Sequence, residues 1–440
     1  MRSRLNHMRT PPGRMLCKLA ASTFLIALML GGIAGAEAAN AHKSTGPADI
    51  DVSAIAPEMD LVKAARQLIR EVDNAPRKIR FLARGKLGQS ADHARTHGRY
   101  IAAAMLVDHA IGLLKNSPIY SPARLAAERA DLADLQRRIG HFSESERNFE
   151  SAIELLRDTG QDGQSASAAL LFPMALNDAD REQFDQAEIL LKRLLDRTGT
   201  ADPRAVPVLN ELGRVYRLQH RFHDAEATLK QALAIVENGP FAAAGGGLSR
   251  LTFDAMGRLY QDWGRYADAE RFYRRNLDAD ESRGLSGDPQ LSRSLDRMGE
   301  LFLAEGRLGD AERVLTRALA ILKPRLGPPL PLVGNVANNL ANVLTSEHRY
   351  AEAKPLFERA IAIKSASVGT DHPDFAATLV DVAGWFDAQG RPGGSAPLYK
   401  RAAEIYAKAL GPDNPKTIAA RGKHSNFQAS RNDDENRAFE

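Results

Sequence analysis

One ten-residue phrase recurs along this chain at a fixed interval. It reads GRYADAERFY at 264–273, GRLGDAERVL at 306–315 and HRYAEAKPLF at 348–357, so that successive copies begin 42 residues apart. Internal repetition with a period of this size is the signature of an array of similar supersecondary units that stack on one another. The 42-residue period therefore constrains the fold of the 440-residue chain more than any local feature does.

The residue at the turn of each copy serves as an anchor for comparing the units. The eight anchors are Tyr100, Phe142, Phe184, Phe222, Tyr266, Leu308, Tyr350 and Pro392. Three residues later every side chain is small: Ala103, Ser145, Ala187, Ala225, Ala269, Ala311, Ala353 and Ser395. Four residues further on every side chain is large and apolar: Val107, Phe149, Leu191, Leu229, Tyr273, Leu315, Phe357 and Tyr399. This spacing places both columns on one face of a helix, so we expect a closely packed helix after each anchor.

A preceding helix is expected upstream of each anchor. Nine residues before the anchors every side chain is again small: Ala91, Ala133, Ala175, Gly213, Gly257, Gly299, Ala341 and Ala383. Because a glycine inside a helix costs about 1 kcal/mol relative to alanine, its repetition predicts close contact between the two helices of a unit. Pro289, Pro331, Pro373 and Pro415 follow at 42-residue intervals and predict the start of each next unit. The pattern predicts an all-α solenoid of about eight antiparallel helix pairs.

These columns resemble a known repeat family. The pattern W/L-x-x-L-G-x-x-Y…A-x-x-x-F…A…P resembles the tetratricopeptide repeat. The phrase HRYAEAKPLFERAIAIKSASVGTDHPDFAATL is most similar to the 42-residue form found in kinesin light chains. The resemblance covers 84–423 and implies a right-handed superhelix in which the first helix of each pair lines a concave groove. Residues 39–83 would form a helical leader, with helical apolar spacing at 58–72, and 424–440 a disordered polar tail.

The first 38 residues have the features of an export signal. A basic region is followed by seventeen mainly apolar residues at 19–35 and by a small-residue site that contains Ala36 and Ala38. This order is typical of a secretory signal peptide, so we expect cleavage after Ala38 in an exported bacterial protein of the periplasm or the medium. An uncleaved inner-membrane anchor is the alternative, although the apolar run is short for a membrane-spanning helix.

Cysteine content and charge narrow the functions of the mature chain. Cys17, the one cysteine, lies within the predicted export signal, so the mature chain would have no thiol for a disulfide or a metal. The full chain has 59 Lys and Arg against 55 Asp and Glu, and removing residues 1–38 leaves 54 of each. A chain without net charge gives no electrostatic reason to expect nucleic acid or an anionic membrane as a partner, and no membrane insertion after cleavage is expected.

Two polar columns mark a candidate groove on the predicted first helices. Three residues before the small column stand Asn210, Asp254, Asp296 and Asn338, and four residues later Arg214, Arg258, Glu300 and Asn342. Positions i and i+4 share a helix face, so these side chains should form a polar ladder along the groove. The resemblance implies that Asn338 and Asn342 can hydrogen-bond the backbone of an extended peptide. A solvated helix face of mixed charge is the alternative for each residue taken alone.

Catalytic and metal-binding patterns are weak by comparison. His93 and His97 have i, i+4 spacing but no third ligand nearby in the sequence, and His372 in GTDHPD is expected to cap a helix or form a turn. Neither a nucleophile-elbow motif nor a P-loop occurs. We therefore expect no catalytic residue, no metal and no cofactor.

The glycine-rich segment 237–250 interrupts the regular period, with anchor spacings of 38 and then 44 residues around it. It is expected to be a long turn, or else a hinge between two stacks of repeats. The sequence favours a non-enzymatic scaffold that binds a protein or extended-peptide partner in the cell envelope, on either the concave or the convex face. The alternatives are a groove for a cell-wall or polysaccharide fragment, an accessory subunit of an envelope assembly or secretion complex, and an enzyme whose site lies in 237–250.

Overall fold

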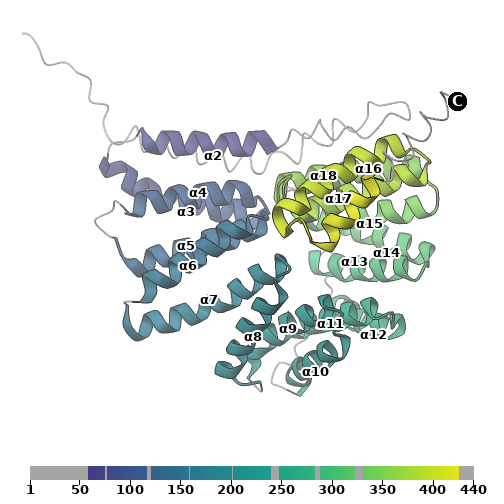
Figure 1. The fold of residues 1–440 in the computed structure, drawn as a ribbon, viewed down its shortest axis with the longest axis horizontal. Coiled ribbons are helices and arrows are strands. Elements are labelled where there is room, and N and C mark those ends of the chain that lie inside the picture. The colour runs from purple at the N-terminus through teal and green to yellow at the C-terminus, as the bar shows by residue number, and fades with distance from the viewer. Residues whose placement is uncertain are drawn as a thin grey trace, which may run out of the picture.

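The computed structural model describes residues 58–74, 77–115, 120–157, 159–200, 202–238, 247–282, 288–322 and 331–425 (Figure 1). Throughout these ranges the secondary structure is helical and no strand occurs, which confirms the predicted all-α fold. The predicted export signal, residues 239–246 of the interrupting segment and residues 426–440 of the predicted tail lie outside the described residues.

The helices form the predicted pairs. The first helices are α3 (Arg77–Thr96), α5 (Pro122–Arg138), α7 (Gly160–Asp180), α9 (Val206–Leu218), α11 (Gly247–Asp262), α13 (Pro289–Ala304), α15 (Pro331–Ser346) and α17 (Pro373–Ala388). The second helices are α4 (Tyr100–Lys115), α6 (Phe142–Arg157), α8 (Phe184–Thr198), α10 (Phe222–Asn238), α12 (Tyr266–Ser282), α14 (Leu308–Leu322), α16 (Tyr350–Ser367) and α18 (Pro392–Leu410). Each second helix begins at its predicted anchor, and α13, α15 and α17 begin at the predicted prolines.

Both ends of the array carry an additional helix. α2 (Glu58–Asp73) packs against α4, and a last helix at 415–425 begins at Pro415 and continues the pattern of a first helix. α3 starts at Arg77, so its first turns fall within the segment that the sequence assigned to the leader. An end helix of this kind covers a stacking face that would otherwise be open to solvent.

The small columns explain how the two helices of a unit approach each other. A Cβ atom added to Gly213, Gly257 or Gly299 would lie 2.5, 2.3 and 2.5 Å from the side chain that faces it. These facing side chains are Leu229, Tyr273 and Leu315, the large members of the next column, and each is at most 1% exposed. The predicted close contact is therefore confirmed, and it depends on the absence of a side chain at the glycine positions.

An arginine in the turn connects successive units. The guanidinium of Arg307 lies 4.1 Å from the ring centroid of Phe302 at the end of the first helix. It also pairs with Glu270 of the preceding second helix at 3.0 Å and with Asp310 of its own second helix at 2.8 Å. The same set of contacts recurs around Arg221 and Arg265, and Arg349 makes the corresponding ion pairs. Each turn is thus fixed to both of its own helices and to the unit before it.

The array curves far enough for its two ends to meet. A Cβ atom on Gly98 would lie 2.9 Å from Pro331 Cδ, and one on Gly140 would lie 3.2 Å from Pro373 Cδ, both across 233 residues of sequence. The third contact joins Glu182 to Asn414 and Lys416, 232 and 234 residues away. Three consecutive turns therefore meet three consecutive unit starts at a nearly constant offset, which we call the seam. Figure 1 shows the last helices returning beside the first units.

A partly buried histidine lies at the centre of the seam. His372 is the N-cap of α17, where its Nδ1 atom accepts a hydrogen bond from the backbone N–H of Asp374 at 2.9 Å, so the predicted capping role is confirmed. Its ring lies edge-on to Phe142 across the seam, with the centroids 6.4 Å apart. Burial lowers the pKa of His372, which keeps the ring neutral and able to accept this hydrogen bond.

Candidate binding surface on the first helices

The first helices form the inner side of the curved array. Neighbouring first helices contact one another, α5 with α7, α7 with α9, α9 with α11, α13 with α15 and α15 with α17, whereas no pair of second helices is in comparable contact. In a curved stack the elements on the inside approach most closely. The polar side chains that connect these first helices are called the inner wall below: Arg137, Asp180, Asn210, Arg214, Asp254, Asp296, Arg297, Glu300, Asn338, Asn339, Asn342 and Asp381.

Ion pairs connect the inner wall across α5, α7 and α9. Arg137 donates to Asp180 at 2.5 Å, and the second carboxylate oxygen of Asp180 accepts from Arg214 at 3.0 Å. Arg214 is also bound by Glu211 of its own helix at 2.6 Å. From α9 to α11 the connection is made by Asn210, whose amide donates to the hydroxyl of Thr252 at 3.0 Å.

The same chemistry continues through the later units. Arg297 on α13 donates to Asp254 on α11 at 3.0 Å and to Glu300 of its own helix at 2.7 Å. The amide of Asn339 on α15 then donates to Asp296 at 2.9 Å and to Glu300 at 3.2 Å. Asn338 donates to Asp381 on α17 at 2.6 Å. A chain of charged and amide groups therefore runs along the inner wall from α5 to α17.

These contacts obey a sequence rule that the column comparison did not use. Arg137 and Asp180, Asp254 and Arg297, Asp296 and Asn339, and Asn338 and Asp381 are all separated by 43 residues. In each pair the second residue therefore lies one position after the residue of the next unit that is equivalent to the first. A search for opposite charges or amides at i and i+43 would have identified Arg137, Asp180, Arg297, Asn339 and Asp381, which the sequence reading missed.

The structure places all eight predicted groove residues on first helices, with different accessibility. Asn210, Arg214, Asp254, Arg258, Glu300 and Asn342 are partly exposed. Asp296 and Asn338 are buried, at 2% and 6% exposure, and are hydrogen-bonded to the adjacent unit. Asp254 and Arg258 form the expected i, i+4 pair at 3.4 Å, while Arg214 turns to Glu211 and Asp180. The groove role of these eight residues stays a prediction.

Burial changes the ionisation of two inner-wall carboxyl groups. Desolvation and the neighbouring carboxylate of Glu300 raise the pKa of Asp296 to about 7. Desolvation also raises the pKa of Asp381, against the opposing effect of hydrogen bonds from Asn338 and Asn342. Near neutral pH the carboxyl group of Asp296 is therefore only partly ionised.

The histidine pair of the first unit is a poor candidate for a metal site. The His93 and His97 rings lie with their centroids 4.2 Å apart, and His97 Nδ1 contacts the backbone oxygen of His93 at 2.7 Å. In the part of the chain that the structure describes, no cluster of three His, Cys, Asp or Glu side chains could hold a metal ion. The described residues also contain no helix that is long and apolar enough to cross a bilayer.

Comparison with solved structures gives likenesses of fold. A putative kinesin light chain of Podosopora anserina with nearly identical TPR-like repeats is 21% identical, with 47% of this chain and 96% of that chain covered and a TM-score of 0.38. BtubC (BKLC) from P. vanneervenii is 20% identical over 53% and 92% of the two chains, with a TM-score of 0.40. The quorum sensor NprR from B. thuringiensis is 15% identical over 79% and 93%, with a TM-score of 0.44.

A comparison with functionally curated proteins found no match. The sequence profile of the tetratricopeptide repeat, by contrast, matches residues 165–238, 249–323 and 332–408, which together make up just over half of the chain. These matches contain the units in which the small columns, the turn arginines and the 43-residue contacts are most regular. The chain belongs to the tetratricopeptide repeat family.

Proposed function

We propose that this protein is a non-enzymatic scaffold that binds an extended segment of a partner protein along its inner wall. The observation that carries the proposal is the continuous line of hydrogen-bonding groups across α5 to α17, on the inner side of a curved array. An extended peptide exposes backbone N–H and C=O groups at regular intervals, and such a line of donors and acceptors complements it.

The polarity of the wall favours a peptide over a sugar as the ligand. Carbohydrate sites use exposed aromatic faces, but the first-helix aromatics Tyr216, Tyr260, Phe302 and Phe386 are at most 5% exposed. The turn arginines stack on these four rings. Of the partly exposed first-helix aromatics, Phe172 packs against the core, and the guanidinium of Arg275 lies 4.0 Å from the ring centroid of Phe253. Partly exposed groups such as Arg214 and Glu300, with 30% and 31% of their side chains accessible, remain available to a polar main chain.

The inner wall is internally neutralised, which sets the chemistry of the partner. Arg214 and Arg297 are each held by two carboxylates, so a strongly charged peptide would have to compete with existing ion pairs. A peptide bound mainly through its backbone avoids this competition. We therefore propose a partner segment with few charges, recognised by its main chain.

A site-specific photo-cross-linker tests which face binds the partner. Placed at Asn342 on the inner wall, it should form adducts with partner protein, while the same group at Arg313 on the outer side of α14, where the side chain is 70% exposed, should not. Adducts from position 313 alone would show that the partner binds the convex face and not the inner wall. Peptide mapping of the adducts then gives the bound segment and its charge.

The cellular location is a separate proposal. We propose that residues 1–38 direct export and are removed after Ala38, on the basis of their basic, apolar and small-residue order. Sequencing of the N-terminus of the protein from an envelope fraction should begin at Ala39. Recovery of the intact chain with the inner membrane would favour the uncleaved anchor.

A further inference from the structure

One apolar column of the repeat contains a single charged member. Four residues before the small column of the first helix, seven units have Leu87, Leu171, Leu209, Phe253, Leu295, Ala337 and Leu379. Leu209, Leu295 and Leu379 are at most 1% exposed, so the column belongs to the core of the array. On α5 the same position is occupied by Arg129, which is only partly exposed. A departure from a rule that the rest of the chain obeys is expected at a functional site.

The charge of Arg129 is not neutralised by the described residues. Its Nη1 atom donates to the amide oxygen of Asn148 at 2.6 Å, while its Nε atom is shielded from solvent and has no hydrogen-bond partner. No carboxylate in the described ranges lies within 4.0 Å of it. Arg137, on the same helix, is instead paired with two carboxylates. A partly buried guanidinium without a counter-ion is a binding group for an anion.

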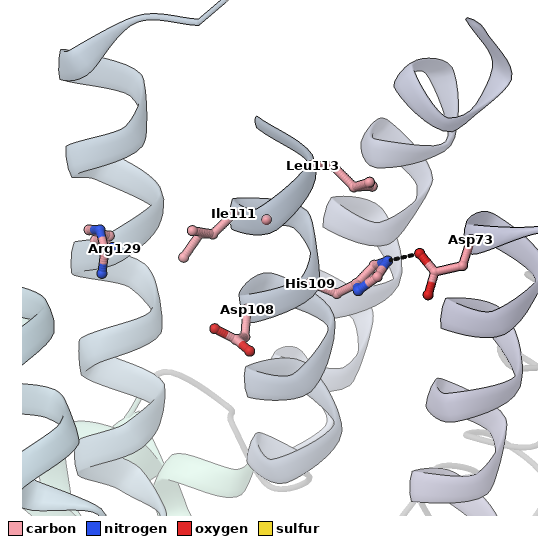
Figure 2. A pocket seen from close by; sticks show the side chains of 7 residues that line it. Asp73, Asp108, His109, Ile111, Leu113 and Arg129 are labelled. Carbon is pink, nitrogen blue, oxygen red and sulfur yellow. Dashed lines mark ion pairs between the residues drawn. The ribbon is translucent and has the colours of Figure 1, made fainter. Parts of the chain in front are cut away.

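Arg129 opens onto a pocket between α2, α4 and α5 (Figure 2). The pocket has a volume of about 450 Å³, which lies within the range of small-molecule sites. Its other lining residues are Asp73, Asp108, His109, Ile111, Gly112 and Leu113. A Cβ atom added to Gly112 would meet nothing within 4 Å, so the absence of a side chain there leaves space on the α4 side of the pocket.

The pocket also contains a carboxylate that is free to accept a cation. Asp108 is exposed and forms no hydrogen bond or ion pair with the described residues. In Figure 2 it projects from α4 toward the side where α5 carries Arg129. His109 points the other way and lies 3.1 Å from Asp73 at the end of α2. The Arg129 guanidinium and the Asp108 carboxylate are therefore the charged lining groups without an ion-pair contact, since Asp73 contacts His109, and the apolar side chains of Ile111 and Leu113 lie beside them.

We propose that this pocket binds a small zwitterion, a free amino acid, independently of the inner wall. Arg129 binds its carboxylate, Asp108 binds its ammonium group, and Ile111 and Leu113 contact its side chain. A guanidinium and a carboxylate form short, charge-assisted hydrogen bonds, which fixes the orientation of the ligand. The two opposite charges exclude simple anions and simple cations, because either would be repelled by one wall of the pocket.

Binding is tested by thermal shift with the mature chain, residues 39–440, and each of the twenty common amino acids. The best amino acid is then compared, by calorimetry, with its deamino and decarboxy analogues. We expect at least one amino acid to raise the melting temperature and both analogues to bind at least about tenfold more weakly. Absence of a shift with all twenty, or equal binding of either analogue, would overturn the proposal.

The variant Arg129→Leu separates a ligand role from a structural one. Other units have leucine at this position, as Leu209, Leu295 and Leu379 show. The variant should therefore fold with unchanged or increased stability, while the ligand-induced shift in melting temperature disappears. Arg124→Leu, an exposed arginine on the same helix, is the matched control and should retain the shift. A destabilised Arg129→Leu protein that still binds the amino acid would show that Arg129 has a structural role and does not bind the ligand. Asn342→Ala should leave this binding unchanged, so the result is distinct from that for the inner wall.

Discussion

The carboxylate of Glu182 receives hydrogen bonds from Asn414 at 2.6 Å and Lys416 at 2.7 Å, although more than 230 residues separate them in sequence. This contact is the most C-terminal of the three that form the seam. It joins the turn between α7 and α8 to the start of the last helix. The inner wall is therefore the lining of one closed superhelical turn of about five and a half units.

The turn of each unit has a residue with a left-handed backbone, and its cost can be measured where that residue is not glycine. Glu182, His220 and His348 occupy the left-handed turn position, with φ of 63°, 59° and 61°, where the five other units have glycine. A side chain in this conformation costs about 1 kcal/mol. His220→Gly should therefore stabilise the fold by about 1 kcal/mol in urea unfolding.

Glu182→Gly relieves the same backbone strain but removes both contacts with the last helix. We expect it to give no net gain in the free energy of unfolding, because the lost hydrogen bonds offset the relief. Equal stabilisation by both glycine variants would mean that the Glu182 contact contributes nothing.

The close approach of the two helices in a unit predicts opposite effects for two glycine substitutions. Gly257→Ala would place a Cβ atom 2.3 Å from the ring of Tyr273, so overpacking should destabilise the protein by about 1–3 kcal/mol. Gly384→Ala on α17 meets nothing within 4 Å and should stabilise its helix by up to about 1 kcal/mol. Thermal melts of the two variants that shift in the same direction would contradict this packing.

These helices and their contacts were predictable because they follow from the period. The anchors give the starts of all eight second helices, and the small column that contains Gly257 predicted the close helix contact, which the structure makes with Tyr273. The seam was not predictable, because the column pattern determines the packing within a unit but not the small rotation between units. This rotation accumulates along the array and brings Gly140 against Pro373. The inner-wall partners were missed because they lie at i+43, whereas the columns compared equivalent positions, which lie at i+42 in most units.

A buried ion pair between α11 and α12 of one unit predicts a large effect from a single substitution. Asp280 is fully buried, lies 2.5 Å from Arg250 and accepts a hydrogen bond from Ser294 at 2.8 Å. Asp280→Ala leaves the Arg250 charge without its partner and should cost about 3–5 kcal/mol of unfolding free energy. Asp278→Ala, an exposed residue on the same helix, is the control and should change it by less than about 0.5 kcal/mol. Similar urea midpoints for both variants would contradict the buried pair.

The inner wall should make stability depend on pH. Because the pKa of Asp296 is raised to about 7, the folded protein retains a proton that the unfolded chain releases near pH 4. The folded state therefore binds more protons between these values, and stability falls as the pH rises from about 4 to 7.

Asp296→Asn keeps an oxygen that accepts from Asn339 but cannot ionise, so it should reduce the loss of stability between pH 5 and pH 8. Urea midpoints at these two pH values give the comparison, with Asp278→Asn as the exposed control. An unchanged pH dependence in the Asp296 variant would show that this group is already ionised at pH 5.

The closed turn itself is tested most directly by electron paramagnetic resonance distances across the seam. Spin labels on cysteines introduced at Gln186 and Ile418, both exposed, can be placed in the mature chain without competing thiols, since Cys17 lies in the predicted export signal. We expect one short, narrow distance distribution, and a longer and broader one when Glu182→Lys repels Lys416. A broad, long distribution that is the same with and without Glu182→Lys would contradict closure of the superhelix.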